Sequence, residues 1–178
     1  MRWKLGLLAV VLLAGCGATS DLETVPPAHA AEPQRAQLRW RESYPPSGQR
    51  LRFAVDRLEI LRDGWSAEIA VTNSTRIPFE LADPSQRVFG VMLFETANID
   101  EITGAADLPP LRKAVKIEPE PPAVLAPNAT WRATLSAPGS LAAGAFLRVS
   151  FGPLVARGTP PGGMEPTVVW ITDKSYRL

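Results

Sequence analysis

Reactive side chains are scarce in this chain, and their positions limit the chemistry that it can perform. Its one cysteine is Cys16 and its one histidine is His29, so residues 30–178 contain neither type. Without an imidazole base, that stretch cannot build a Ser–His–Asp or Cys–His nucleophile. It also lacks the thiolate and imidazole ligands typical of zinc, copper and iron sites. The sequence therefore predicts a domain with no catalytic residues, no metal ligands and no cofactor.

Carboxylates and amides are the remaining groups to consider. Glu118 and Glu120 flank a proline in a proline-rich segment, a setting that favours two solvated charges over the paired acid and base of a glycosidase. Asn98, Asp100 and Glu101 offer oxygen ligands, but their spacing differs from that of a calcium loop. We therefore expect no enzyme activity.

Three tryptophans are the candidate binding residues. Trp131 and Trp170 lie in alternating segments, which suits either the packing between two sheets or the wall of a ligand pocket. Trp40 lies outside the clearest strands and is the stronger candidate for a docking contact. The segment around it alternates, so it is either a first edge strand or a docking segment.

The N-terminal segment carries the one specific motif. Basic residues precede an apolar run from Leu5 to Ala14, which is shorter than the roughly 20 residues that a bilayer-spanning helix needs. Short apolar runs behind basic residues are typical of secretory leaders. The run ends in Leu13-Ala14-Gly15-Cys16. This pattern resembles the signal peptide and lipobox of bacterial lipoproteins.

The resemblance implies how the chain is processed and where it resides. Residues 1–15 would be a signal peptide that is cut before Cys16, whose thiol would carry diacylglycerol. The protein would then be exported and attached through this lipid to the bacterial cell membrane or the outer membrane. Gly17, in place of an aspartate, favours the outer membrane in a cell that has two.

Composition and charge are those of one globular domain. Apolar residues make up 46% of the chain and the net charge is +1, which gives no overall attraction to nucleic acid. The charge is uneven, however, because residues 35–62 hold seven arginines and three acids, whereas residues 63–108 hold eight acids and two arginines. The basic stretch is either ordinary surface polarity or a surface for anionic headgroups.

A tether is expected to follow the lipidated cysteine. Residues 16–48 are rich in proline, alanine and polar types, and residues 17–36 show no period of either a helix or a strand. Such a segment is typical of a disordered or polyproline-like linker, and its length would reach about 60 Å if fully extended. We therefore place the start of the folded domain near residue 49.

Residues 49–178 carry the alternation of half-buried strands. Residues 51–72 read as a β-hairpin that turns at Asp63-Gly64, with a slip of phase at Asp56-Arg57 that predicts a bulge. Further strands are expected at 88–94, 129–136, 146–151 and 167–172, and shorter ones at 77–81 and 111–117. Residues 96–128 interrupt this pattern as an irregular, proline-rich insertion.

Seven to eight strands separated by glycine, proline and asparagine turns predict an all-β, antiparallel sandwich. The piece from Trp65 to Phe94 resembles the strand–turn–strand of immunoglobulin-like domains in exported bacterial proteins. There, a valine-rich strand ends in asparagine and a small polar turn, and a strand containing Pro-Phe follows.

Two functions fit these observations. The first is a lipid-anchored cell-envelope protein with a non-catalytic, immunoglobulin-like binding domain that contacts an envelope partner. The alternative is a small-ligand-binding lipoprotein accessory to a transporter, with its pocket between the sheets near Trp131 and Trp170. Both involve the membrane through Cys16, and neither involves nucleic acid.

Overall fold

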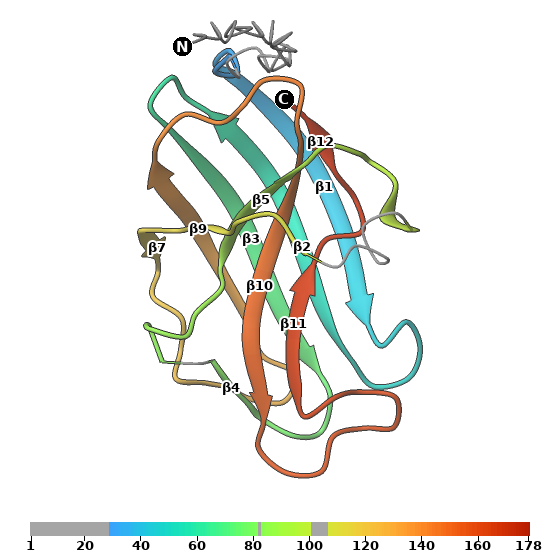
Figure 1. The fold of residues 1–178 in the computed structure, drawn as a ribbon. Coiled ribbons are helices and arrows are strands. Elements are labelled where there is room, and N and C mark those ends of the chain that lie inside the picture. Colours follow the sequence, from blue (N-terminus) through green and yellow to red (C-terminus); the bar gives the residue numbers. More distant parts are fainter. Residues whose placement is uncertain (1–28, 82, 101–106) are drawn as a thin grey trace, which may run out of the picture.

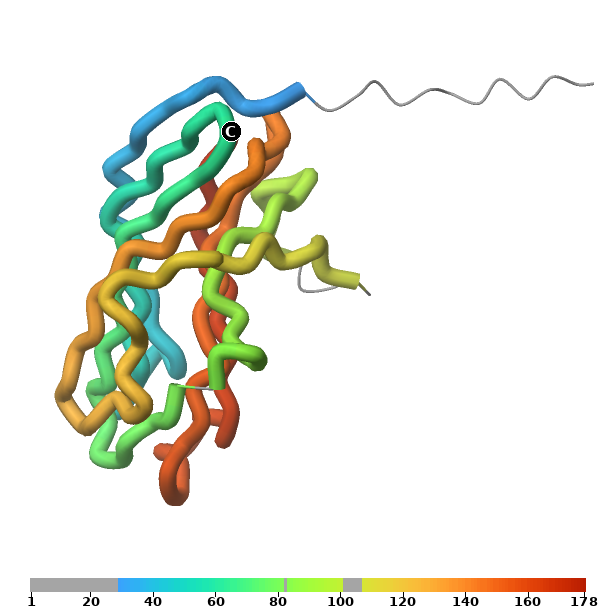
Figure 2. The backbone as a smooth tube through the Cα atoms, turned by 90° about the vertical axis from the view of Figure 1, so that its left-hand side faces the viewer, coloured from blue at the N-terminus to red at the C-terminus, as the bar shows by residue number. Residues whose placement is uncertain are grey.

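The computed structural model of the protein describes residues 29–81, 83–100 and 107–178. These residues form two antiparallel sheets that pack face to face, which confirms the predicted all-β sandwich (Figure 1). The five-stranded sheet contains β1 (Gln34–Tyr44), β2 (Arg50–Ile60), β3 (Gly64–Ser74), β9 (Thr130–Pro138) and β7 (Lys116–Glu118), in that order. Figure 2 shows the two layers edge-on.

The seven-stranded sheet is built around one long strand, β10 (Phe146–Ala156). On one side β10 pairs with β5 (Gly90–Phe94) and β4 (Phe79–Leu81), which lead to β6 (Arg112–Lys113) and β8 (Val124–Leu125). On its other side lie β11 (Thr167–Ile171) and β12 (Tyr176–Arg177). The described chain thus holds twelve strands, more than the seven to eight predicted, because five of them are only two or three residues long.

The core lies between the sheets and is rich in aromatic rings. Alternation in β2 turns Leu51, Phe53 and Val55 inward, where each is at most 2% exposed. The Phe53 ring meets Phe151 of β10 with 5.2 Å between ring centroids. The hairpin of β2 and β3 and the bulge between Val55 and Arg57 are confirmed.

The tether prediction was wrong for residues 34–44, because these form β1 at the edge of the five-stranded sheet, which confirms the edge-strand alternative for the segment around Trp40. The chain is already paired before β1 begins, since Ala31 N–H donates to Leu141 O at 2.7 Å. Alternation in this segment is interrupted by a bulge at which Arg39 adopts a φ of 50°. The folded domain therefore begins before β1 and not near residue 49, as the sequence predicted.

The expectation of an irregular insertion at 96–128 was also wrong in part. The second half of this segment forms three short strands. The strands β6 and β8 join the seven-stranded sheet beside β5 and β4, and β7 joins the five-stranded sheet beside β9. These short strands have little pattern of their own and are held by their partners. Gly90 permits the β5–β6 contact, because a Cβ on Gly90 would lie 2.3 Å from the Arg112 carbonyl oxygen.

The hydrogen bonds of the Asn73 side chain explain why an asparagine lies near the end of β3. Its side chain is fully buried and all of its polar atoms are used. Its Nδ2 donates to the carbonyls of Ile77 at 2.8 Å and Leu125 at 3.1 Å. Its Oδ1 accepts from the backbone N–H of Thr75 at 3.0 Å and from the hydroxyl of the same residue at 2.7 Å. One amide therefore joins the β3–β4 turn to β8.

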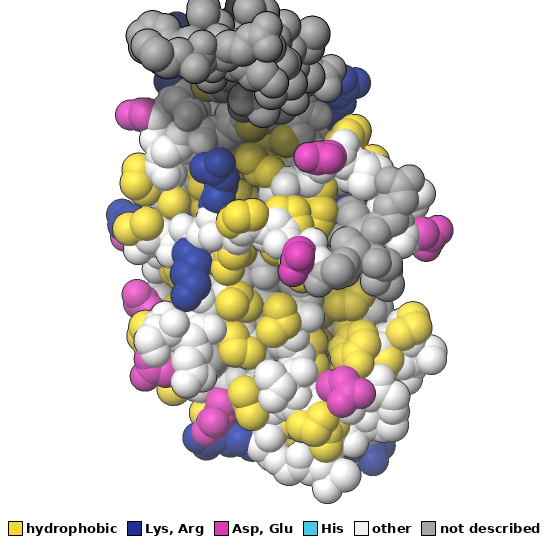
Figure 3. All heavy atoms as spheres, viewed as in Figure 1, with side chains coloured by type: hydrophobic (Ala, Val, Ile, Leu, Met, Phe, Trp, Pro, Cys, Tyr) yellow, Lys and Arg dark blue, Asp and Glu magenta, His cyan; other side chains and the backbone are white. Residues whose placement is uncertain are grey.

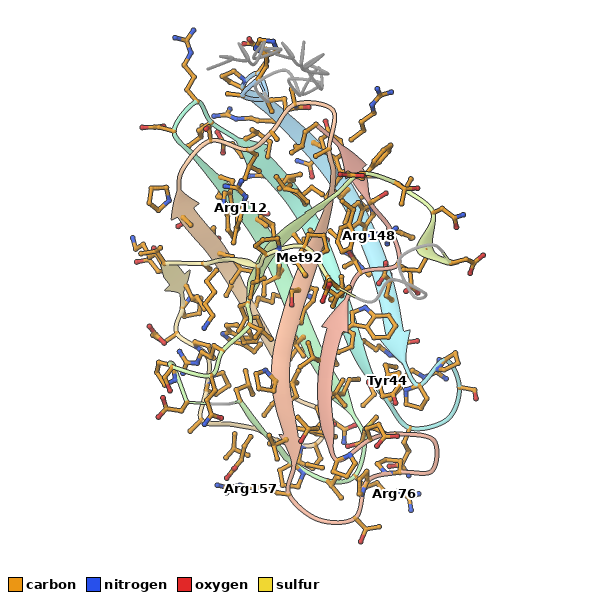
Figure 4. All side chains as sticks on the ribbon, in the orientation of Figure 1. Tyr44, Arg76, Met92, Arg112, Arg148 and Arg157 are labelled. Carbon is orange, nitrogen blue, oxygen red and sulfur yellow. The ribbon has the colours of Figure 1, made fainter. Side chains whose placement is uncertain are left out.

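The outer side of the seven-stranded sheet carries a second, smaller core. Met92 and Phe94 of β5 are buried there against Phe146, Ile171, Ile99 and Leu111, the last two from the described parts of the insertion. Arg148 is paired with Met92 in the sheet (Figure 4) and is fully buried. Hydrophobic side chains lie among the charged ones over this side of the molecule (Figure 3).

Arg148 crosslinks the segments that cover this core. Its guanidinium donates to the carbonyls of Thr172 at 2.6 Å and Ala97 at 2.8 Å, and also to that of Asp173. It lies over the Phe94 ring, 5.6 Å from the centroid, in a cation–π arrangement. Burial lowers the pKa of Arg148, while the carboxylates of Asp173 and Glu42 act in the opposite direction.

Candidate functional site

The outer face of the five-stranded sheet brings together side chains from four strands. Arginine, serine and threonine point to this face because the residues between them point into the core. The register places them in two neighbouring rows across β1, β2, β3 and β9. One row is Arg41, Ala54, Ala70 and Arg132, and the next is Ser43, Arg52, Thr72 and Thr130.

The small residues in the middle of these rows leave a half-open hollow of about 420 Å³. Ala54 and Ala70 lie in its floor, between longer side chains on β1 and β9. Strands spaced about 4.8 Å apart put the backbones of Arg41 and Arg132 roughly 14 Å from each other, one on each side of the hollow. We call it the arginine hollow after the four arginines that line it, Arg41, Arg50, Arg52 and Arg132.

Asp56 orients two of these arginines. The β2 bulge sets Asp56 beside the hollow, where its Oδ1 lies 2.5 Å from Arg41 Nη2. Its Oδ2 lies 3.8 Å from Arg132 Nη1, so a single carboxylate faces two guanidinium groups. These pairs are exposed, so they contribute little to stability and leave both cations able to exchange partners.

The other two arginines differ in how they are held. Arg50 donates to the carbonyls of Pro46 at 2.9 Å and Gly48 at 3.0 Å, which ties it to the β1–β2 turn. Arg52 is exposed, and among the described residues it has neither a salt-bridge partner nor a side-chain hydrogen bond. Arg52 is therefore the cation of the hollow with the least competition for a ligand.

Glu42 also lines the hollow, but its carboxylate is engaged elsewhere. Its oxygens accept from Trp170 Nε1 at 2.8 Å and from the backbone N–H groups of Asp173 at 2.9 Å and Lys174 at 3.0 Å. This carboxylate links the edge strand β1 to the turn after β11. Four arginines, against this committed glutamate and Asp56 at the side, leave the hollow with a net positive charge.

The rest of this sheet face is balanced in charge. Salt bridges join Arg35 to Glu59 at 2.7 Å and Arg57 to Glu68 at 2.9 Å. On the edge strand β7, Lys116 lies 2.8 Å from Glu118. Of the seven arginines in residues 35–62, three therefore line the arginine hollow and two are paired with glutamates outside it.

This arrangement is suited to an anion. Guanidinium groups match the geometry of carboxylates and phosphates and can bind them through two parallel hydrogen bonds. The hydroxyls of Thr72 and Thr130, 2.8 Å apart, add donors beside Arg52. The two rows carry no aromatic side chain, so this part of the sheet offers no stacking platform for a base.

Two of the candidate tryptophans are buried. Trp40 is 8% exposed and belongs to the core, so the prediction that it is a docking contact was wrong. Trp131 is 6% exposed, meets Phe89 edge-on at 5.3 Å, and donates from Nε1 to Pro119 O at 3.2 Å. Both indoles therefore hold the fold together.

Trp170 is half-buried and lies parallel to Phe53, with 5.6 Å between ring centroids. Its ring closes the side of the core between β1 and β11 and orients Glu42. The lining of the arginine hollow includes none of the three tryptophans. The rings occupy the place predicted for a pocket between the sheets.

The lipidation motif lies outside the described residues, as does Cys16 itself. Among residues 29–81, 83–100 and 107–178, no helix has the length and apolar character needed to cross a bilayer. The same residues contain no cluster of three or more acidic or histidine side chains arranged to hold a metal ion.

Sequence reasoning detected the basic stretch but missed the site. Three of its arginines, Arg41, Arg50 and Arg52, come from that stretch, whereas Arg132 lies on β9 and reaches the hollow only through strand pairing. Alternation of arginine with apolar residues in 50–53 was the available signal. The chain matches no protein-family model, no curated protein and no solved structure.

Proposed function

We propose that this chain is a lipid-anchored protein of the bacterial cell envelope whose immunoglobulin-like sandwich is a non-catalytic binding module for an anionic partner. The arginine hollow is the observation that carries the proposal. It gathers four cations over a floor of alanine, the glutamate that lines it is engaged with the turn after β11, and Asp56 lies at its side. The lipobox at Leu13–Cys16 supports the anchor.

The partner group that fits is a cluster of carboxylates or phosphates. Arg52 supplies an uncommitted guanidinium, while Arg41 and Arg132 can turn from Asp56 to a ligand with more negative charge. A hollow of about 420 Å³ falls within the usual range of roughly 300–1,000 Å³ for small-ligand sites. This volume favours the second candidate as well, a lipoprotein that binds a small anion and serves a transporter.

Binding to tripolyphosphate and citrate tests the site. We expect calorimetry on the mature protein in detergent to show binding that weakens with added salt. Arg52→Ala and Arg132→Ala should each weaken it about tenfold or more, because a charged hydrogen bond contributes about 1.5–3 kcal/mol. Arg177→Ala is the matched control, since Arg177 is an exposed arginine on β12 of the other sheet.

If both substitutions in the hollow leave anion binding unchanged, the arginine hollow is not the site. If neither anion binds the parent protein, the proposal is refuted as well. Binding of citrate alone at low micromolar concentration would favour the small-ligand function. The anchor has a separate test. Radioactive palmitate should label the protein, Cys16→Ser should remove the label, and persistent labelling would contradict lipidation at Cys16.

A further inference from the structure

One end of the sandwich is identified by the entry of the chain. The backbone of His29 accepts from Ala143 N–H at 2.7 Å, so the first described residue is docked against the loop before β10. The same loop reaches the β2–β3 turn, where Gly139 N–H donates to Asp63 O at 2.7 Å. The entry point, the β2–β3 turn and the loop 139–143 therefore share one end of the molecule (Figure 1).

The length of chain before His29 limits how far this end can lie from a lipid on Cys16. Twelve residues, 17–28, separate the two. Fully extended, they span at most about 40 Å, which is similar to the length of β1 itself. The segment therefore keeps this end within about 40 Å of the bilayer surface, whereas the opposite end can lie farther away.

The same end carries exposed apolar side chains. Leu61, in the β2–β3 turn, is 43% exposed, and Val115, beside β7, is 78% exposed. They line a shallow hollow of about 300 Å³ whose walls include Ala137, Pro138 and the edge of Trp65. Its surface is more strongly non-polar than that of the arginine hollow.

Charged neighbours surround this apolar hollow in a pattern suited to a bilayer surface. Arg62 follows Leu61 in the turn, and Lys116 follows Val115. Their long side chains can reach the phosphate level while the apolar groups lie deeper. Asp63 is the one acid that lines the hollow, and it lies on the exposed turn.

We propose that the end of the sandwich marked by Leu61 and Val115 rests on the bilayer that holds the lipid on Cys16, with these two side chains in the interfacial region. This inference depends on the anchor proposed above. Two side chains are too few to hold a free domain on a membrane, but the tether raises their effective concentration at the surface.

This orientation leaves the arginine hollow open to partners. The hollow is formed by Arg41 and Ser43 near the end of β1, whereas β1 enters the sheet at Gln34 beside the apolar end. It also lies on a face of the sheet rather than at the tip. A domain that rests on its apolar tip therefore presents the arginines away from the headgroups.

Single-cysteine labelling measures which surface meets the bilayer. In the lipid-anchored protein the Cys16 thiol is blocked, so a bimane label attaches only to an introduced cysteine. We would place it by Leu61→Cys, Val115→Cys, Val169→Cys and Arg52→Cys, one at a time. Val169 is the matched control, because it is an exposed apolar residue, at 50%, on the edge strand β11.

The labelled proteins are reconstituted into vesicles of phosphatidylethanolamine and phosphatidylglycerol with brominated phosphatidylcholine, which quenches fluorophores in contact with acyl chains. We expect quenching at positions 61 and 115 at least twofold stronger than at 169 and 52. Circular dichroism shows whether each exposed substitution leaves the sandwich folded.

Stronger quenching at position 52 would mean that the arginine face lies on the headgroups, and would overturn the inference. Equal quenching at all four positions, or none, would do the same. If palmitate labels Cys16 but positions 61 and 115 are not quenched, the anchor stands and only the orientation fails. If Cys16 carries no lipid, both fail.

Discussion

Replacing Arg148 by methionine should release the segments that cover the outer side of the seven-stranded sheet. Arg148 is 0% exposed, and its guanidinium binds three backbone carbonyls. One belongs to Ala97 at the start of the insertion, and two belong to the turn after β11. Methionine fills much of the same volume beside Met92 and Phe94 but donates no hydrogen bond.

The expected loss follows from the positions of the three carbonyls. That of Thr172 is buried, and leaving it without a donor costs about 1–3 kcal/mol. Those of Ala97 and Asp173 are only partly buried, so water can replace the guanidinium and each loses about 1 kcal/mol or less. The substitution also removes the cost of burying the charged guanidinium of Arg148, whose Nε has no hydrogen-bond partner among the described residues. This gain offsets part of the loss. We expect a net destabilisation of about 2–4 kcal/mol.

Urea unfolding followed by tryptophan fluorescence measures this change in free energy. Limited proteolysis should show earlier cleavage near residues 95–100, because Ala97 is held by this contact. Arg177→Met is the control, since Arg177 is exposed and a surface substitution should change stability by no more than about 0.5 kcal/mol. If Arg148→Met is as stable as the parent and no more sensitive to protease, the crosslinking role of this arginine is wrong.

Three further substitutions test the fold and its charges. Asn73→Ala should lower the free energy of unfolding by about 2–4 kcal/mol, because it leaves buried groups of the β3–β4 turn without partners, and a loss below 1 kcal/mol in urea would contradict this. Gly90→Ala should cost about 1–3 kcal/mol, since the new Cβ would lie 2.3 Å from the Arg112 carbonyl oxygen, and unfolding in urea at an unchanged midpoint would show that β6 can move away freely. Burial is the main cause that raises the pKa of Asp173 above its ordinary 3.8, and the Glu42 carboxylate adds to it, while the Arg148 guanidinium acts in the opposite direction. The charged form of Asp173 therefore lowers the stability of the folded state, and this cost is complete once the pH exceeds both the unfolded and the folded pKa. Asp173→Asn should therefore be more stable than the parent at pH 7, with the gain disappearing as the pH falls below the unfolded value, and a variant that is less stable at pH 7 would reverse the sign of this argument.

Local pattern was sufficient for the long strands. Alternation in 51–72, 129–136 and 146–151 predicted four long strands, the first two of them as a hairpin, because a strand with one buried face must repeat every two residues. The slip of phase at Asp56 marked a bulge for the same reason. Turn residues then placed the hairpin correctly.

Local pattern was not sufficient for elements that depend on their partners. The strands β6, β7 and β8 are two or three residues long, and prolines surround them, so only the exposed edges of existing strands stabilise them. Residues 34–44 lay inside the expected tether, although alternation around Trp40 left open either a first edge strand or a docking segment. Burial of that ring decided in favour of a strand.

What the sequence by itself determined is therefore the class of the fold, the scarcity of nucleophiles and the excess of arginine in residues 35–62. Tertiary structure alone decided where that charge acts. Strand pairing places Arg132 in the same row as Arg41, three strand spacings away. The two alanines between them leave the space that a ligand needs. A site whose residues come from four strands has no complete local signature, because only strand pairing brings those residues together.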